Sequence, residues 1–82
     1  MIMSKSKTRK MRIFLHNDSV NSFQNVIYVL TNVLPHCNIL RAESIAQITH
    51  NTGKCQIYHG YFNESIVLYS QLVKHGLHVS VQ

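Results

Sequence analysis

Three polar residues have the types and the spacing to hold an ammonium group. Asn17 and Asp18 follow a short alternating apolar segment, and His50 stands three residues before Gly53, near the end of a helical pattern. A carboxylate, an amide oxygen and a neutral imidazole nitrogen are three hydrogen-bond acceptors, which match the three protons of an ammonium group. If the two helices between these residues pack antiparallel, the three side chains meet at one corner and form a site for a primary amine.

The same residues also have ordinary structural roles. An Asn-Asp pair often only turns the chain, because both side chains hydrogen-bond nearby backbone amides. A histidine in the last turn of a helix is favoured by the helix dipole. From spacing alone, both interpretations stay open.

An apolar recess is expected next to the amine position. Val26 on the first predicted helix would face Ala46 and Thr49 on the second. The site would therefore take a primary amine that carries an apolar side chain.

Other kinds of chemistry have less support. The chain has six histidines, but no Cys-x-x-Cys pair and no His-x-x-x-His pair, which are spacings typical of metal sites. Neither cysteine and no serine lies in a recognisable nucleophile elbow. We therefore expect no metal, no cofactor and no enzymatic activity.

The elements that position these residues are expected in the order strand, helix, helix, strand, helix, strand. Alternating apolar residues predict strands over residues 11–16, 54–59 and 77–81, and Gly60 is expected to turn the chain after the second strand. Each helix has a predicted N-cap and a residue that ends it: Asn21 and Pro35 for the first, Asn38 and Gly53 for the second, Asn63 and Gly76 for the third.

Three short strands cannot bury both faces of a sheet in a chain of 82 residues. The expected fold is therefore α+β, a three-stranded, mainly antiparallel sheet covered on one side by three helices. No apolar run approaches the roughly 20 residues that cross a bilayer, and the N-terminus lacks an apolar signal core. We expect a soluble, intracellular monomer with Cys37 and Cys55 reduced.

The positive charge is concentrated at the N-terminus. Of eight basic residues, five lie in residues 5–12, and from residue 13 onward three basic residues balance three acidic ones. We predict a flexible basic arm over residues 1–10 and a folded domain over 11–82. Nucleic acid is not an expected partner of this neutral body; a small nucleic-acid- or ribosome-associated domain that uses the arm is the alternative function.

Four short motifs, taken together, resemble the ClpS family, adaptors that recognise N-terminal degradation signals (N-degrons) for AAA+ Clp proteases. They read "LHND" at 15–18, "HNTGK" at 50–54, "GYFN" at 60–63 and "LHVSVQ" at 77–82. The resemblance covers residues 11–82 and has the order of the family motifs. It implies a ClpS-like sandwich and a non-enzymatic adaptor in the bacterial cytosol, the plastid stroma or a phage-infected cell.

The resemblance also implies roles for individual residues. Asn17, Asp18 and His50 would bind the free α-amino group of proteins that begin with Leu, Phe, Tyr or Trp. Ala46 stands where the family usually has Met, so Ile or Val is also expected at the first position. The implied side-chain pocket comprises Asn21, Phe23, Val26, Ala46, Thr49 and Leu77.

One departure from the family concerns the partner. The third helix of family members docks on the Clp unfoldase through charged side chains, and the corresponding positions here read Ser65, Leu68 and Ser70. We expect that the chain still binds substrates and delivers them to a Clp-type unfoldase. We expect its docking surface for the unfoldase to be divergent.

Overall fold

The computed structural model describes residues 9–82, and its elements follow the predicted order. The strands β1 (Lys10–His16), β2 (Lys54–Tyr61) and β3 (Val79–Val81) form one antiparallel sheet in the order β2-β1-β3. The α+β fold is confirmed, with the first strand at the centre of the sheet. Of the predicted basic arm, residues 1–8 lie outside the described residues.

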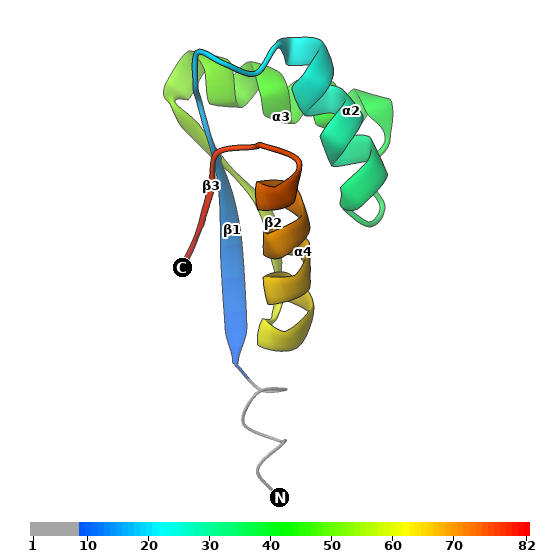
Figure 1. Cartoon of the computed structure of the whole chain (residues 1–82), viewed down its shortest axis with the longest axis vertical. Coiled ribbons are helices and arrows are strands. Elements are labelled where there is room, and N and C mark those ends of the chain that lie inside the picture. The colour runs from blue at the N-terminus through cyan, green and yellow to red at the C-terminus, as the bar shows by residue number, and fades with distance from the viewer. Residues whose placement is uncertain (1–8) are drawn as a thin grey trace, which may run out of the picture.

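Three helices lie on one side of this sheet (Figure 1). Helix α4 (Phe62–Lys74) packs on all three strands, α3 (Ile39–Thr52) packs on β2, and α2 (Phe23–Val33) packs on the other two helices. The loop from β1 to α2 and the end of α3 therefore lie near each other at one end of the molecule.

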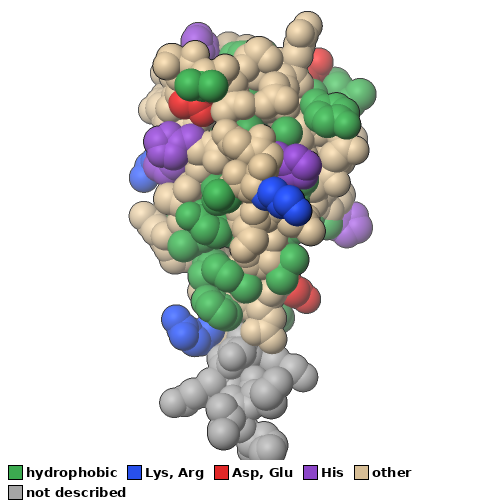
Figure 2. All heavy atoms as spheres, viewed as in Figure 1, with side chains coloured by type: hydrophobic (Ala, Val, Ile, Leu, Met, Phe, Trp, Pro, Cys, Tyr) green, Lys and Arg blue, Asp and Glu red, His purple; other side chains and the backbone are tan. Residues whose placement is uncertain are grey.

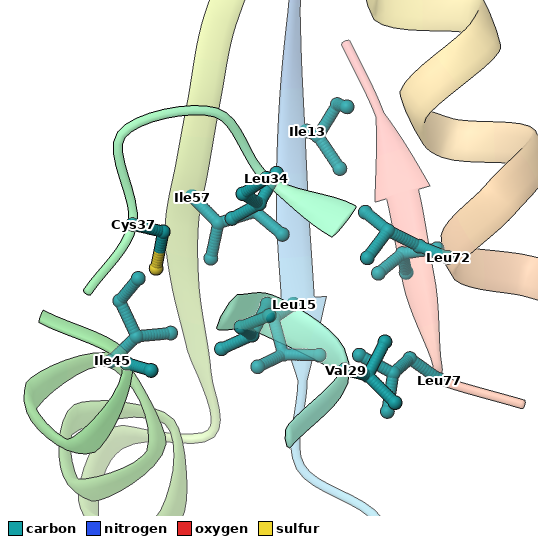
Figure 3. Close-up of a cluster of buried hydrophobic side chains, with 12 residues drawn as sticks. Ile13, Leu15, Val29, Leu34, Cys37, Ile45, Ile57, Leu72 and Leu77 are labelled. Atoms are coloured by element: carbon teal, nitrogen blue, oxygen red, sulfur yellow. The ribbon is translucent and has the colours of Figure 1, made fainter. Parts of the chain in front are cut away.

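The core lies between the sheet and the helices, as expected for a sheet with one covered face. Ile13 and Leu15 alternate with exposed or half-buried neighbours on β1, and Leu30 and Leu72 meet them from α2 and α4. Figure 3 shows this cluster, in which Val29 adds a second side chain from α2, and Ile57, Ile45 and Leu77 come from β2, α3 and the turn after α4. Burial of these side chains holds each helix against the sheet.

Two helix starts differ from the prediction. Ser22, not Asn21, caps α2, and its hydroxyl accepts a hydrogen bond from the backbone N–H of Asn25 at 3.1 Å. Helix α4 begins at Phe62 without a side-chain cap, so Asn63 lies inside its first turn. Asn38 does cap α3, accepting from the N–H of Arg41 at 2.9 Å.

Gly60 does not turn the chain. It lies within β2, opposite Met11, and the strand continues to Tyr61, where the Phe62 N–H donates to the Arg9 carbonyl at 2.8 Å. A Cβ on Gly60 would lie 2.7 Å from the Tyr58 ring, so glycine allows that ring to lie close to the backbone. Pairing with β1 thus keeps the chain extended beyond the predicted end of the strand.

The two predicted glycine stops are confirmed. Gly53 and Gly76 have φ angles of 97° and 86°, the left-handed region in which glycine avoids a steric penalty. After Gly76, the Leu77 N–H donates to the Leu72 carbonyl at 3.1 Å, which closes the turn before β3 starts at Val79. The observed last strand, Val79–Val81, is therefore shorter than the predicted strand over residues 77–81.

Candidate functional site

The loop between β1 and α2 is shaped by the Asp18 carboxylate. Its Oδ1 accepts hydrogen bonds from the backbone N–H groups of Val20 at 2.8 Å and Asn21 at 2.7 Å. One residue earlier, the Asn17 N–H donates to the Gly53 carbonyl at 2.9 Å. This last bond joins the loop to the end of α3 and brings the Asn-Asp pair to the helix turn that carries His50.

Asp18 is held in its charged form. The backbone hydrogen bond from Asn21 lowers the pKa of the Asp18 carboxyl below its ordinary value of 3.8, and the bond from Val20 and the nearby His78 act in the same direction. Partial burial opposes them without reversing the shift. A carboxylate with this environment is ionised at neutral pH and can attract an ammonium group.

Asn21 connects the loop to a second segment. Its side-chain Nδ2 donates to Asp18 Oδ2 at 3.1 Å and to the Gly76 carbonyl at 2.9 Å, and its Oδ1 accepts from Asn25 Nδ2 at 2.6 Å. The side chain predicted to cap α2 instead fixes Asp18 against the turn between α4 and β3.

His50 lies in the last turn of α3, exposed to solvent. The Phe23 ring at the start of α2 meets it edge to face, with ring centroids 5.5 Å apart and an interplanar angle of 79°. The antiparallel packing of α2 and α3 expected from their short connection therefore places His50 at the same corner as Asp18.

These side chains surround one pocket of about 220 Å³. Its walls include every residue predicted for the site except Leu77, which is 4% exposed and packs in the core. The complete lining is Leu15, His16, Asn17, Asp18, Asn21, Phe23, Val26, Ala46, Thr49 and His50.

Leu15 and His16 were not predicted as lining residues. They belong to the end of β1, directly before the Asn-Asp pair, and their nearness in sequence was the only available signal. Leu77, which was expected in the pocket wall, lies in the turn before β3 and packs in the core.

The interior of the pocket is apolar on its helical side. Ala46 and Thr49 are both buried, one turn apart on α3, and face half-buried Val26 on α2. The Thr49 hydroxyl donates to the Ile45 carbonyl at 2.8 Å, so the donor is satisfied within the helix. The pocket thus combines polar acceptors at one corner with an apolar recess.

The described residues, 9–82, offer little support for other kinds of chemistry. No group of three or more His, Cys, Asp or Glu side chains in this part of the chain could hold a metal ion. Both cysteines are free thiols, and burial raises the pKa of Cys37 and of Cys55, which keeps them protonated at neutral pH. No helix of the described chain is long and apolar enough to cross a membrane.

Comparison with known proteins bears on this site. Residues 6–80 match the family model described as "ATP-dependent Clp protease adaptor protein ClpS". No curated protein sequence gave a significant match. Because the family match covers nearly all of the 82 residues and the fold has the same order of elements, the chain belongs to the ClpS family of Clp protease adaptors.

Proposed function

We propose that the pocket between β1, α2 and α3 holds the first residue of N-degron proteins, which the chain delivers to a Clp-type AAA+ protease. Asn17, Asp18 and His50 bind the free α-amino group. The first side chain enters the recess formed by Val26, Ala46 and Thr49. The observation that carries this proposal is the convergence of three acceptor side chains on the polar corner of one apolar pocket.

The hydrogen bonds of Asp18 leave room for an ammonium group. Its Oδ1 accepts two backbone bonds and its Oδ2 accepts one bond from Asn21. A carboxylate has about four acceptor positions, so one remains on Oδ2 for a ligand. Because the loop already orients the carboxylate, little ordering is needed on binding.

The recess explains the preference for an apolar first side chain. Complete burial of a Leu or Phe side chain contributes about 1.5–3 kcal/mol. Phe23 lies at the mouth of the pocket, where it contacts His50 and remains 41% exposed. Its ring can therefore cover a bound side chain as well as the histidine.

We infer that docking on the unfoldase differs from the charged contacts implied by the resemblance. Ser65 is completely buried and Leu68 is half-buried against the core, so only Ser70 of these three positions is exposed. The exposed part of α4 presents Val67 and Val73, with Glu64 and Lys74 as the only charged side chains of the helix. Figure 2 shows hydrophobic side chains at the surface in the lower half of the molecule, where Figure 1 places β1 and α4.

The experiment that tests the proposal compares two peptides. A fluorescent peptide that begins with Leu is titrated with the protein, and its N-acetylated copy serves as the control. We expect binding of the free peptide and a severe loss on acetylation, because acetylation removes the charge and two of the three N–H donors. Equal binding of both peptides would exclude the amine site.

A further inference from the structure

The sheet has a second face, which the helices of residues 9–82 leave open. On β1, side chains that alternate with buried Ile13 and Leu15 point to this face, and opposed residues of antiparallel strands share a face. We call it the open face. Its residues are Lys10, Arg12, Phe14 and His16 of β1, Lys54, Gln56, His59 and Tyr61 of β2, and Ser80 of β3.

Charge on the open face has one sign. Lys10, Arg12 and Lys54 lie on it, with two histidines between them. The three acidic residues of the chain lie elsewhere: Asp18 in the loop after β1, Glu43 on α3 and Glu64 in the first turn of α4. The other two basic residues of the body, Arg41 and Lys74, lie with these acidic residues on the helical side of the sheet, so the open face carries an excess of positive charge.

Each aromatic ring of the open face is paired with a lysine. The Lys54 ammonium lies 5.1 Å from the centroid of the Phe14 ring, and the Lys10 ammonium lies 5.2 Å from that of Tyr61. At the edge of the sheet, the Arg9 guanidinium lies 5.2 Å from the Phe62 ring. Tyr61 is 46% exposed, so a flat ligand can reach its ring.

The open face is long enough for a short extended chain. From Lys10 to His16 the strand extends about 20 Å, and three paired strands span about 10 Å. The two cation–aromatic pairs lie toward opposite ends of this strip, because Lys10 pairs with Tyr61 and His16 pairs with Lys54 in the register of β1 and β2.

We propose that the open face binds single-stranded nucleic acid, as a function separate from the peptide pocket, with whose lining it shares only His16. Single-stranded nucleic acid alternates flat bases with negative phosphates. Proteins that bind it without sequence preference combine aromatic rings for stacking with basic side chains along the backbone. An acidic peptide has the charge but no regularly placed rings, and a bilayer surface would favour protruding apolar side chains where the open face has Gln56 and Ser80.

The first test separates the open face from general positive charge. The full chain is titrated with fluorescent oligouridine and oligothymidine of about 12 nucleotides at several salt concentrations. The double variant Lys10→Gln/Lys54→Gln removes two charges from the face. Its matched control, Arg41→Gln/Lys74→Gln, removes two charges from α3 and α4 on the other side of the sheet.

We expect the face variant to reduce the slope of log affinity against log salt by about 1.4, the value for two lost phosphate contacts to a single strand. The control variant should leave the slope unchanged. Equal effects of the two double variants would overturn the proposal, since only net charge would then matter. Tighter binding of one of the two oligonucleotides shows which of these two single strands the face prefers and supports the proposal.

The second test concerns stacking. Tyr61→Leu should weaken binding of the oligonucleotide by about 5- to 150-fold, the range for loss of one stacked base. Tyr28→Leu, at an exposed tyrosine on α2, is the matched control and should have no effect. Unchanged binding in Tyr61→Leu overturns the proposal, as does equally tight binding of poly-glutamate or of phosphatidylserine vesicles that is insensitive to Tyr61→Leu.

The two functions can fail separately. Asp18→Ala should weaken peptide binding severely and leave oligonucleotide binding intact, whereas Lys10→Gln/Lys54→Gln should weaken oligonucleotide binding and leave peptide binding intact. Competition of a Leu-starting peptide with the oligonucleotide for one site would overturn the separation.

Discussion

At the scale of single residues, the polar corner of the pocket depends on Asp18. Its carboxylate holds the loop through two backbone hydrogen bonds, and the bond from Asn21 helps to keep its pKa low. Asn17 and His50 line the same corner, from the loop after β1 and from the last turn of α3. In the proposed function, Asp18 supplies the negative charge that attracts the ammonium group, and Asn17, Asp18 and His50 together orient it.

Asp18→Ala and His50→Ala should each weaken binding of a Leu-starting peptide by tens- to thousands-fold. Loss of one partner of a desolvated, charged hydrogen bond costs about 2 to 5 kcal/mol. Fluorescence anisotropy measures the binding, and thermal melting checks that each variant folds. Glu43→Ala, which removes an exposed carboxylate from α3, is the matched control and should bind normally. Retained binding in both pocket variants would refute the assignment.

Ala46 determines the width of the recess in our proposal. It is buried one helical turn before His50, and a larger side chain there would narrow the pocket. Ala46→Met should therefore weaken peptides that begin with Ile or Val more than those that begin with Leu. A misfit of one methylene is worth about 1 to 3 kcal/mol. Four peptides, starting with Leu, Phe, Ile and Val, are compared on both proteins, and equal losses for all four would mean that Ala46 does not set selectivity.

At the scale of elements, the neighbouring residues Asn21 and Ser22 at the start of α2 have different structural roles. Ser22 caps the helix, whereas Asn21 fixes Asp18 to the turn after α4. The pocket therefore depends on the turn between α4 and β3, even though this turn contributes no lining residue.

Asn21→Ala and Ser22→Ala should consequently have different effects. Ser22→Ala removes the cap and should lower the free energy of unfolding by about 1 kcal/mol, with little change in peptide affinity. Asn21→Ala should weaken peptide binding more than it lowers stability, because Asp18 loses its side-chain partner. Denaturant unfolding and peptide anisotropy are measured on both variants. The reverse pattern would show that Asn21 acts through the helix start.

At the scale of the whole molecule, the pocket and the N-terminal segment are separate in the chain. Every lining residue lies at or after Leu15, and the strand that leads into the pocket begins at Lys10. Contacts of the N-terminal segment with a partner are therefore expected to be independent of the amine contact.

Deletion of residues 1–8 should spare peptide affinity and reduce delivery of substrate to a partner unfoldase. This deletion leaves β1 complete and keeps Arg9, whose carbonyl accepts a bond from Phe62. Because lysines 5 and 7 are lost, part of the reduced delivery should depend on salt. Peptide affinity and degradation of a Leu-starting substrate are measured side by side; poor peptide binding by the truncated protein would place this segment in the pocket.

Much of the fold could be predicted from local patterns. The alternation around Ile13 and Leu15 indicated a half-buried strand, and Asn38, Gly53 and Gly76 acted as predicted at the ends of helices. These signals are local, since a cap or a left-handed glycine depends on a few adjacent residues. Asn17, Asp18 and His50 were predicted as a site from their types and spacing together with the family resemblance, and the fold places all three in the lining of one pocket.

Tertiary structure decided what local patterns left open. Asn21 and Ser22 are both residue types that cap helices. Ser22 caps α2 because the Asn21 side chain is bound instead to Asp18 and to the distant Gly76 carbonyl. Pairing with β1 carried β2 past Gly60, and packing turned Leu77 into the core. The gathering of Lys10, Arg12 and Lys54 on one face of the sheet likewise depends on the register of the strands, which a count of charges along the sequence does not reveal. Local patterns in the sequence thus determined the elements and the types of side chain available to the pocket, whereas long-range pairing determined the limits of the elements and which side chains share a surface.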